Sequence, residues 1–91
     1  MSHAFYSDAA EKILRSDLTT GERTAVMSVR ASLEEEPTPE HARRLPDADP
    51  RSQSYAIDLL PDQTGGRGIS VVYRHDRTLD AVLILWLIAG P

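Results

Sequence analysis

Cysteine is absent from this 91-residue sequence, which excludes disulfide bonds and thiolate metal sites and fits a reducing compartment. Long apolar runs are missing too. The longest, Ala81–Ala89, has nine residues, whereas a membrane-spanning helix needs about twenty. The first residues lack the basic and apolar segments of a secretory signal peptide. Together these absences predict a soluble, cytoplasmic protein that does not enter a membrane.

Positive charge is also scarce. The chain has 10 lysines and arginines against 14 acidic residues, so its formal net charge is −4 at pH 7. Proteins that bind nucleic acid normally present a basic face to the phosphates, and this composition argues against such bulk attraction. The one dense group of cations is the segment Arg67–Arg77, RGISVVYRHDR, which holds three arginines and a histidine.

Cofactor and metal motifs are missing as well. The histidines, at positions 3, 41 and 75, do not have metal-ligand spacing to carboxylates. The glycine-rich stretch 65–68 lacks the lysine and the following helix of a phosphate-binding loop. We therefore expect no metal and no cofactor. The length fits a single domain, residues 1–91, with a core of modest stability.

The first half of the chain has the pattern of two helices after a short strand. Ser7 has the position of an N-cap, and Thr19 with Glu22 has the spacing of a capping box. A stripe of Val26, Val29 and Leu33 gives the second helix an apolar face. The predicted elements are an edge strand at His3–Tyr6 and helices at Asp8–Ser16 and about Thr20–Glu35, the second ended by Pro37. The acidic run Glu34–Glu36 falls at a helix C-terminus, where the helix dipole disfavours it.

The second half has the pattern of strands. Residues 37–52 are a proline-rich connector with Leu45 as its core anchor and a possible helical turn at Glu40–Arg44. Strands are predicted at Ser54–Leu60, Ile69–Arg74 and Ala81–Ile88, with a mobile loop at Pro61–Gly68. The last strand is apolar on both faces, which predicts a central strand covered on both sides, with Trp86 in the core. The fold class is α+β: a helical hairpin packed on a small antiparallel sheet.

Three stretches carry a resemblance to a known family. They are AFYSDAAEKIL, HARRLPDAD and ISVVYRHDRTLDAVLILWLIAGP, and together they cover nearly the whole chain. In this order they resemble the RelE/ParE superfamily of type II toxins, which belong to toxin–antitoxin systems. The resemblance implies a RelE/ParE-like fold and a toxin-like protein that inhibits growth through translation or gyrase and is neutralised by a cognate antitoxin.

The sequence also departs from that family. RNA-cleaving members have an arginine three residues before the tyrosine of a Val-Tyr pair, where this chain has Ser70, and the nearest upstream arginine is Arg67. Those members continue after the last strand with a basic or aromatic segment, whereas this sequence stops at Gly90-Pro91. The resemblance therefore implies the fold but not an intact nuclease site.

RNA cleavage without metal needs a base, an acid and cations on the phosphate. The candidate catalytic residues are Arg67, Arg74 and His75, and the candidate binding residues are Arg77, Arg43, Arg44 and Tyr73. Adjacent strand residues point to opposite faces, so only one of Tyr73 and Arg74 can line an open face. The alternative is that residues 74–80 form a solvated turn.

Three functions stay open on these grounds. The chain is a ribosome-dependent mRNA endonuclease, a gyrase-blocking protein, or a non-catalytic binding or dimerisation module. The corresponding partners are the ribosome with mRNA, DNA gyrase, or a second copy in a homodimer, each alongside the antitoxin. Ser70 and the acidic net charge favour the second and third functions over the first.

Overall fold

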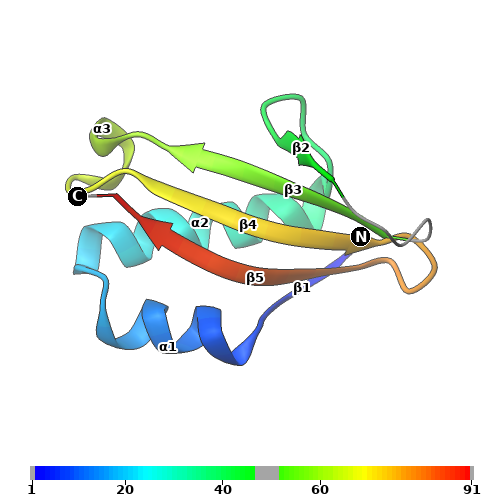
Figure 1. The fold of residues 1–91 in the computed structure, drawn as a ribbon, viewed down its shortest axis with the longest axis horizontal. Coiled ribbons are helices and arrows are strands. Elements are labelled where there is room, and N and C mark those ends of the chain that lie inside the picture. The colour runs from blue at the N-terminus through cyan, green and yellow to red at the C-terminus, as the bar shows by residue number, and fades with distance from the viewer. Residues whose placement is uncertain (1, 47–51, 91) are drawn as a thin grey trace.

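The computed structural model describes residues 2–46 and 52–90, with the side chain of Ser52 left aside (Figure 1). Five strands and three helices make up this part of the chain. In chain order they are β1 (His3–Tyr6), α1 (Asp8–Ser16), α2 (Thr20–Glu35), β2 (Arg43–Leu45), β3 (Ser52–Leu59), α3 (Pro61–Thr64), β4 (Ile69–Asp76) and β5 (Ala81–Ala89). The α+β class and the positions of α1 and α2 agree with the sequence-based prediction.

All five strands form one sheet, in the order β1-β5-β4-β3-β2. β1 runs parallel to β5, and the other neighbours are antiparallel. The predicted edge position of β1 and the interior position of β5 are both confirmed. The helices α1 and α2 run in opposite directions, so they return the chain to the end of the sheet where β1 finished. The four strands of the meander then alternate in direction, and the last of them, β5, runs parallel to β1.

Each of the two long helices begins next to a residue whose side chain caps its first turn. The Ser7 hydroxyl accepts a hydrogen bond from the Ala10 amide at 3.1 Å. At α2, the Thr19 hydroxyl accepts from the Glu22 amide, and the Glu22 carboxylate accepts from the Thr19 amide at 2.9 Å. The predicted N-cap and capping box are therefore confirmed. They satisfy amide groups that a helix start otherwise leaves without partners.

α1 and α2 lie side by side on one face of the sheet and pack mainly against β1 and β5 (Figure 1). Val26 and Leu33 of the predicted stripe are fully buried, and Val29 packs at the margin of the core. Arg30 ties α2 to β1, because its Nε donates to the Ala4 carbonyl at 2.9 Å and its guanidinium lies over the Tyr6 ring. The opposite face of the sheet carries no helix among the described residues.

Two connecting segments differ from prediction. Pro61–Gly68, expected as a loop, begins with the single-turn helix α3, whose C-cap Gly65 has a φ of 73°, a left-handed conformation that suits glycine. In the connector 37–52, Arg43–Leu45 forms the strand β2, so the prediction of a helical turn at Glu40–Arg44 was wrong. Pairing with β3 supplies backbone partners that an isolated turn lacks. The rest of that connector, residues 47–51, lies outside the described residues.

The prediction that β5 is covered on both sides is also wrong. Val82 and Ile84 face the helices and are fully buried, but Leu83, Trp86 and Ile88 are 40%, 53% and 57% exposed. Trp86 is therefore not a core residue. The helices cover only one face of the sheet, so the second apolar face of β5 meets water. Among the described residues, no helix is long and apolar enough to cross a bilayer.

Candidate functional site

Arg67 lies at the α3 end of the molecule and is held by a buried carboxylate. Its Nε and Nη2 donate to the two oxygens of Glu22, each at 3.0 Å, and its backbone amide donates to the same carboxylate. Glu22 is 1% exposed. Hydrogen bonds from the Arg67 side chain are the main reason that the pKa of Glu22 is lowered. This arginine thus neutralises a buried charge that the capping box of α2 requires.

Tyr73 is equally committed to the fold. Its ring is fully buried and stacks on Tyr55 with centroids 5.5 Å apart. Its hydroxyl donates to the Pro37 carbonyl at 2.8 Å, which joins β4 to the segment that follows α2. Burial raises the pKa of the Tyr73 phenol, with a smaller contribution from Tyr55. As the sequence predicted, Tyr73 and Arg74 take opposite faces, and Arg74 is the exposed member of the pair.

Arg43 belongs to a polar cluster on the open face of the sheet. Its Nε and Nη2 lie 3.2 and 3.3 Å from the two oxygens of Asp58, and the Ser70 hydroxyl donates to Asp58 at 2.7 Å. These hydrogen bonds, that of Arg43 first, lower the pKa of Asp58. Ser70, at the position where the sequence resemblance implies an arginine, is therefore bonded to a carboxylate. Because Asp58 also pairs with Arg43, this cluster has no excess positive charge for a phosphate.

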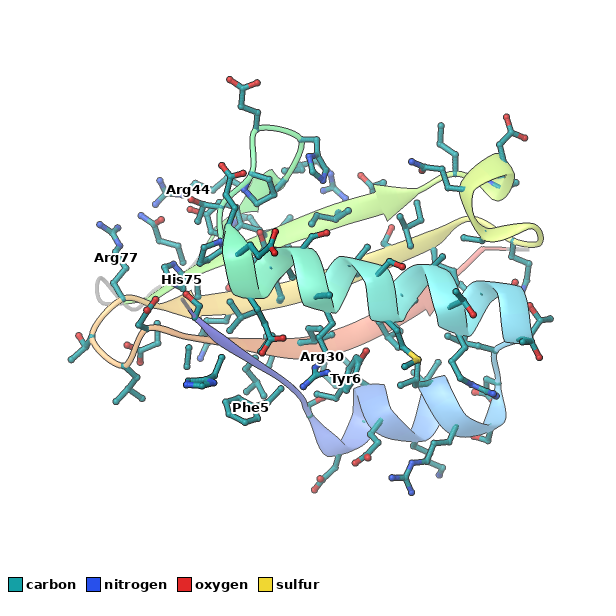
Figure 2. The ribbon with its side chains drawn as sticks, turned by 180° about the vertical axis from the view of Figure 1, so that it is seen from behind. Phe5, Tyr6, Arg30, Arg44, His75 and Arg77 are labelled. Atoms are coloured by element: carbon teal, nitrogen blue, oxygen red, sulfur yellow. The ribbon has the colours of Figure 1, made fainter. Side chains whose placement is uncertain are left out.

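His75 and Arg77 line a pocket of about 260 Å³ together with Thr38, Gln53 and Tyr55. The His75 Nε2 is buried, makes no hydrogen bond to the described residues, and lies 3.7 Å from an oxygen of Asp80. Arg44 pairs with Tyr55 in register, and Figure 2 shows Arg44, His75 and Arg77 at the same end of the sheet. This pocket lies on the helix-bearing side, away from the open face.

The structure does not bring the three catalytic candidates together. Arg67 precedes β4, whereas Arg74 and His75 lie near its far end, and the strand from Ile69 to Arg74 spans roughly 17 Å. Arg74 and His75 are neighbours on the strand and take opposite faces. An acid, a base and a phosphate-binding cation within reach of one phosphodiester are therefore not assembled from these residues. No group of three metal-binding side chains occurs among the described residues either.

An apolar surface was missed by the sequence analysis. Phe5 of β1, which is 56% exposed, pairs in register with Leu83, and Trp86 and Ile88 continue along β5 on the same face. We call these four residues the open-face patch. The signal for it was present in the two-sided apolar pattern of β5, which was interpreted as burial. Such a contiguous patch is typical of a surface that another protein covers.

The element order and pairing define a RelE-like α+β fold. A search of solved structures matches the crystal structure of the archaeal RelE-RelB complex from Pyrococcus horikoshii OT3, with a TM-score of 0.76 and 20% identity. The match covers 97% of this chain and 93% of that chain, and it confirms the fold that the resemblance implied. No protein-family model matches the sequence, and no curated protein does.

Proposed function

We propose that this protein is the toxin-like subunit of a toxin–antitoxin pair and that it acts by binding a protein target, without cutting RNA. The whole-chain likeness to a structure of the RelE-RelB complex supports the toxin–antitoxin assignment. The surface chemistry supports a binding mechanism. The open-face patch, Phe5, Leu83, Trp86 and Ile88, is the observation that carries the second part, because exposed apolar side chains suit contact with a protein, whereas phosphate chemistry needs cations.

The candidate catalytic and binding arginines and His75 lie apart from one another, which supports the same mechanism. Arg67 forms an ion pair with Glu22, and Arg43 forms an ion pair with Asp58. His75 faces a pocket on the other side of the sheet from Arg74. A gyrase-blocking action fits such a surface, because it needs a binding face and no catalytic group. Inhibition of translation through cleavage of mRNA would need an arrangement that these residues do not form.

Induced expression in a bacterial host tests the proposal, with growth, mRNA integrity and plasmid topology followed in parallel. We expect growth arrest, intact mRNA, altered supercoiling, and rescue on co-expression of the small protein encoded beside this gene. Codon-linked mRNA cuts that disappear in His75→Ala would overturn the binding mechanism. Arrest that no neighbouring gene product relieves would overturn the toxin–antitoxin assignment.

A non-catalytic binding module on the same fold is the second candidate. The open-face patch favours it equally, since a protein with no toxic action has the same need to cover exposed apolar side chains. The growth experiment separates the two, because a binding module forms a complex with the neighbouring gene product and causes no arrest.

A further inference from the structure

One pocket of the structure takes no part in the proposed function. It has a volume of about 260 Å³ and lies on the opposite side of the sheet from the open-face patch. Figure 2 shows this end of the sheet, with His75 and Arg77, beyond the last turn of α2, so that helix leaves the space uncovered. We call it the His75 pocket, and its lining residues are Thr38, Gln53, Tyr55, His75 and Arg77.

The register of the sheet builds the floor of the His75 pocket. Gln53 of β3 lies directly opposite His75 of β4, and the two residues of such a cross-strand pair point to the same face. Tyr55 lies two residues further along β3, so it points to this face as well. The Tyr55 hydroxyl donates to the Oε1 of Gln53. The amide NH₂ of Gln53 is therefore left as a hydrogen-bond donor for a ligand.

A hydrogen bond from the core holds the connector after α2 beside this floor. The Tyr73 hydroxyl donates to the Pro37 carbonyl at 2.8 Å. Thr38 follows Pro37 directly and lines the pocket, so the position of its hydroxyl is fixed through that bond. Arg77 follows the end of β4 and lines another side. Polar groups from three separate segments, the connector, β3 and the end of β4, thus surround one space.

The lining is basic although the protein is acidic. The formal net charge of the chain is −4, yet none of the five lining residues is a carboxylic acid. The Asp80 carboxylate lies 3.7 Å from the buried Nε2 of His75 and does not line the pocket. The lining therefore presents hydrogen-bond donors together with a guanidinium, and with an imidazolium when His75 is protonated.

Two arginines at this end of the sheet are available to a ligand. Arg77 is exposed, and Arg44 of β2 is the register partner of Tyr55, so its side chain lies beside the pocket on the same face. Figure 2 shows both arginines near His75. Neither arginine forms an ion pair with another residue in the part of the chain that the structure describes. The positive charge here is thus not neutralised as it is at Arg67 and Arg43.

We infer that the His75 pocket binds the phosphate group of a small molecule, either free phosphate or a sugar phosphate. A guanidinium offers a planar fork of donors that matches phosphate oxygens, and hydrogen bonds to an ionised group are roughly twice as strong as neutral ones. Donors that converge from three segments suit the tetrahedral oxygens of phosphate better than the two coplanar oxygens of a carboxylate. The volume is below the range of about 300–1,000 Å³ typical of pockets for drug-sized ligands, which limits the ligand to a small one.

NMR titration of the full-length protein tests the location of this site. The probes are inorganic phosphate, ribose 5-phosphate and ribose. We expect both phosphate compounds to shift the backbone amides of Gln53, His75 and Arg77. The amides of Phe5 and Ile88 on the open face should stay unchanged, and ribose should shift none of these amides.

The relative affinities of the probes identify the source of the phosphate. Tighter binding of ribose 5-phosphate than of inorganic phosphate indicates a sugar phosphate, and equal affinity indicates free phosphate. Absence of saturable shifts in the pocket with both phosphate compounds, or an equal response to ribose, would overturn the inference. None of these outcomes bears on the toxin–antitoxin assignment, because the pocket and the open-face patch lie on different sides of the sheet.

Matched arginine variants test the role of charge. Arg77→Gln removes the guanidinium that lines the pocket, whereas Arg15→Gln removes an exposed guanidinium from α1 and changes the net charge equally. We expect Arg77→Gln to weaken phosphate binding about tenfold or more and Arg15→Gln to change it less than about twofold. Arg44→Gln, beside the pocket, should have an intermediate effect of about threefold. Equal affinities for Arg77→Gln and Arg15→Gln would overturn the site.

A matched pair of glutamine variants tests the pocket by adding a negative charge. Gln53→Glu places a carboxylate in the lining and keeps an oxygen that accepts from the Tyr55 hydroxyl. Gln63→Glu adds the same charge in α3 and keeps an oxygen that accepts from the Leu60 amide. We expect phosphate binding to fall at least tenfold in Gln53→Glu and less than twofold in Gln63→Glu, with cooperative thermal melts for both. Phosphate affinity that is retained in a folded Gln53→Glu protein would rule the site out, and if that variant does not fold, Arg77→Gln at its exposed position decides.

Discussion

The two faces of β5 have nearly the same composition and opposite surroundings. Val82, Ile84 and Leu87 lie under the helices and are buried, while Leu83, Trp86 and Ile88 point to the bare side of the sheet. An apolar side chain therefore predicts that a position is better covered than exposed to water. Only the arrangement of helices and sheet shows what covers it. On one face the covering group is this chain's own helices. On the other face we assign that role to another protein.

The sharpest way to break this comparison is to place the same charge on each face. Ile84→Asp buries an unpaired carboxylate under the helices. This costs several kcal/mol in a domain whose total stability is about 5–15 kcal/mol. We expect loss of the cooperative thermal transition, measured by circular dichroism.

Ile88→Asp is the matched control on the same strand. Ile88 is exposed, so the carboxylate stays hydrated and the melt should remain cooperative and near that of the parent. If Ile88→Asp unfolds the protein as Ile84→Asp does, the open face is a covered surface and the distinction between the two faces fails.

A smaller loss of stability is expected when the arginine that pairs with the buried Glu22 carboxylate is removed. Arg67→Ala leaves the Glu22 carboxylate inside the fold without its cation. Arg67 is partly exposed, but its loss leaves the buried carboxylate unpaired, and we expect the melting temperature to fall by on the order of 10 °C. Arg43→Ala, which breaks an exposed pair with Asp58, should lower it by only about 2 °C. Equal shifts would show that the Glu22 pair is not special.

The same pair predicts a dependence on pH. The folded pKa of Glu22 lies below its ordinary value of 4.5, so its contribution is fully present above that pH and is lost as the pH falls through the folded pKa. In Arg67→Ala that contribution is already reduced. The difference in melting temperature between the parent and Arg67→Ala should therefore narrow on acidification below about pH 4.5. A constant difference down to pH 3 would contradict this assignment.

Local signals made most of the fold predictable. Ser7, Thr19 and Glu22 are helix-start residues that act through their nearest amides, so their effect can be inferred from spacing alone. The strands followed from alternation and β-branched side chains. β2 was missed because three residues in a proline-rich segment become a strand only when β3 lies beside them. α3 was missed because a single turn leaves almost no periodic pattern.

The site was less predictable because proximity in sequence was taken as proximity in space. Arg67 and Arg74 belong to one basic segment, but an extended strand carries them apart. The partner that occupies Arg67 is Glu22, which is 45 residues away in sequence and so gave no local signal. The exposure of Trp86 depended on how many helices cover the sheet, which a strand's own composition does not specify.

Trp86 allows the exposure of the open face to be measured directly. It is the single tryptophan in the sequence, so intrinsic fluorescence reports on this face alone. We expect ready quenching by acrylamide in the folded protein and only a small emission shift on unfolding. When a partner covers the open-face patch, emission should shift to the blue. Blue-shifted, weakly quenched emission from the free protein at all concentrations would show that Trp86 is buried.

The smallest effect is expected where the family resemblance suggests the largest. Ser70→Arg restores the arginine that the resemblance places in RNA-cleaving members, on the open face and directly opposite Asp58 and Ile88. We expect no RNA cleavage and a stability change within about 0.5 kcal/mol, because the position is partly exposed.

The physical reason is that one cation does not make a phosphodiester site. Asp58 would pair with the introduced guanidinium, and His75 lies five residues further along β4 and faces the pocket on the other side of the sheet. One added cation supplies neither a general acid nor a general base. Primer extension on total mRNA after induction, compared with the parent and with Ser70→Lys, measures the outcome. Ribosome-dependent cuts in Ser70→Arg alone would show that the open face retains a nuclease arrangement lacking only this arginine, and they would contradict the expectation that one added cation does not make a nuclease site.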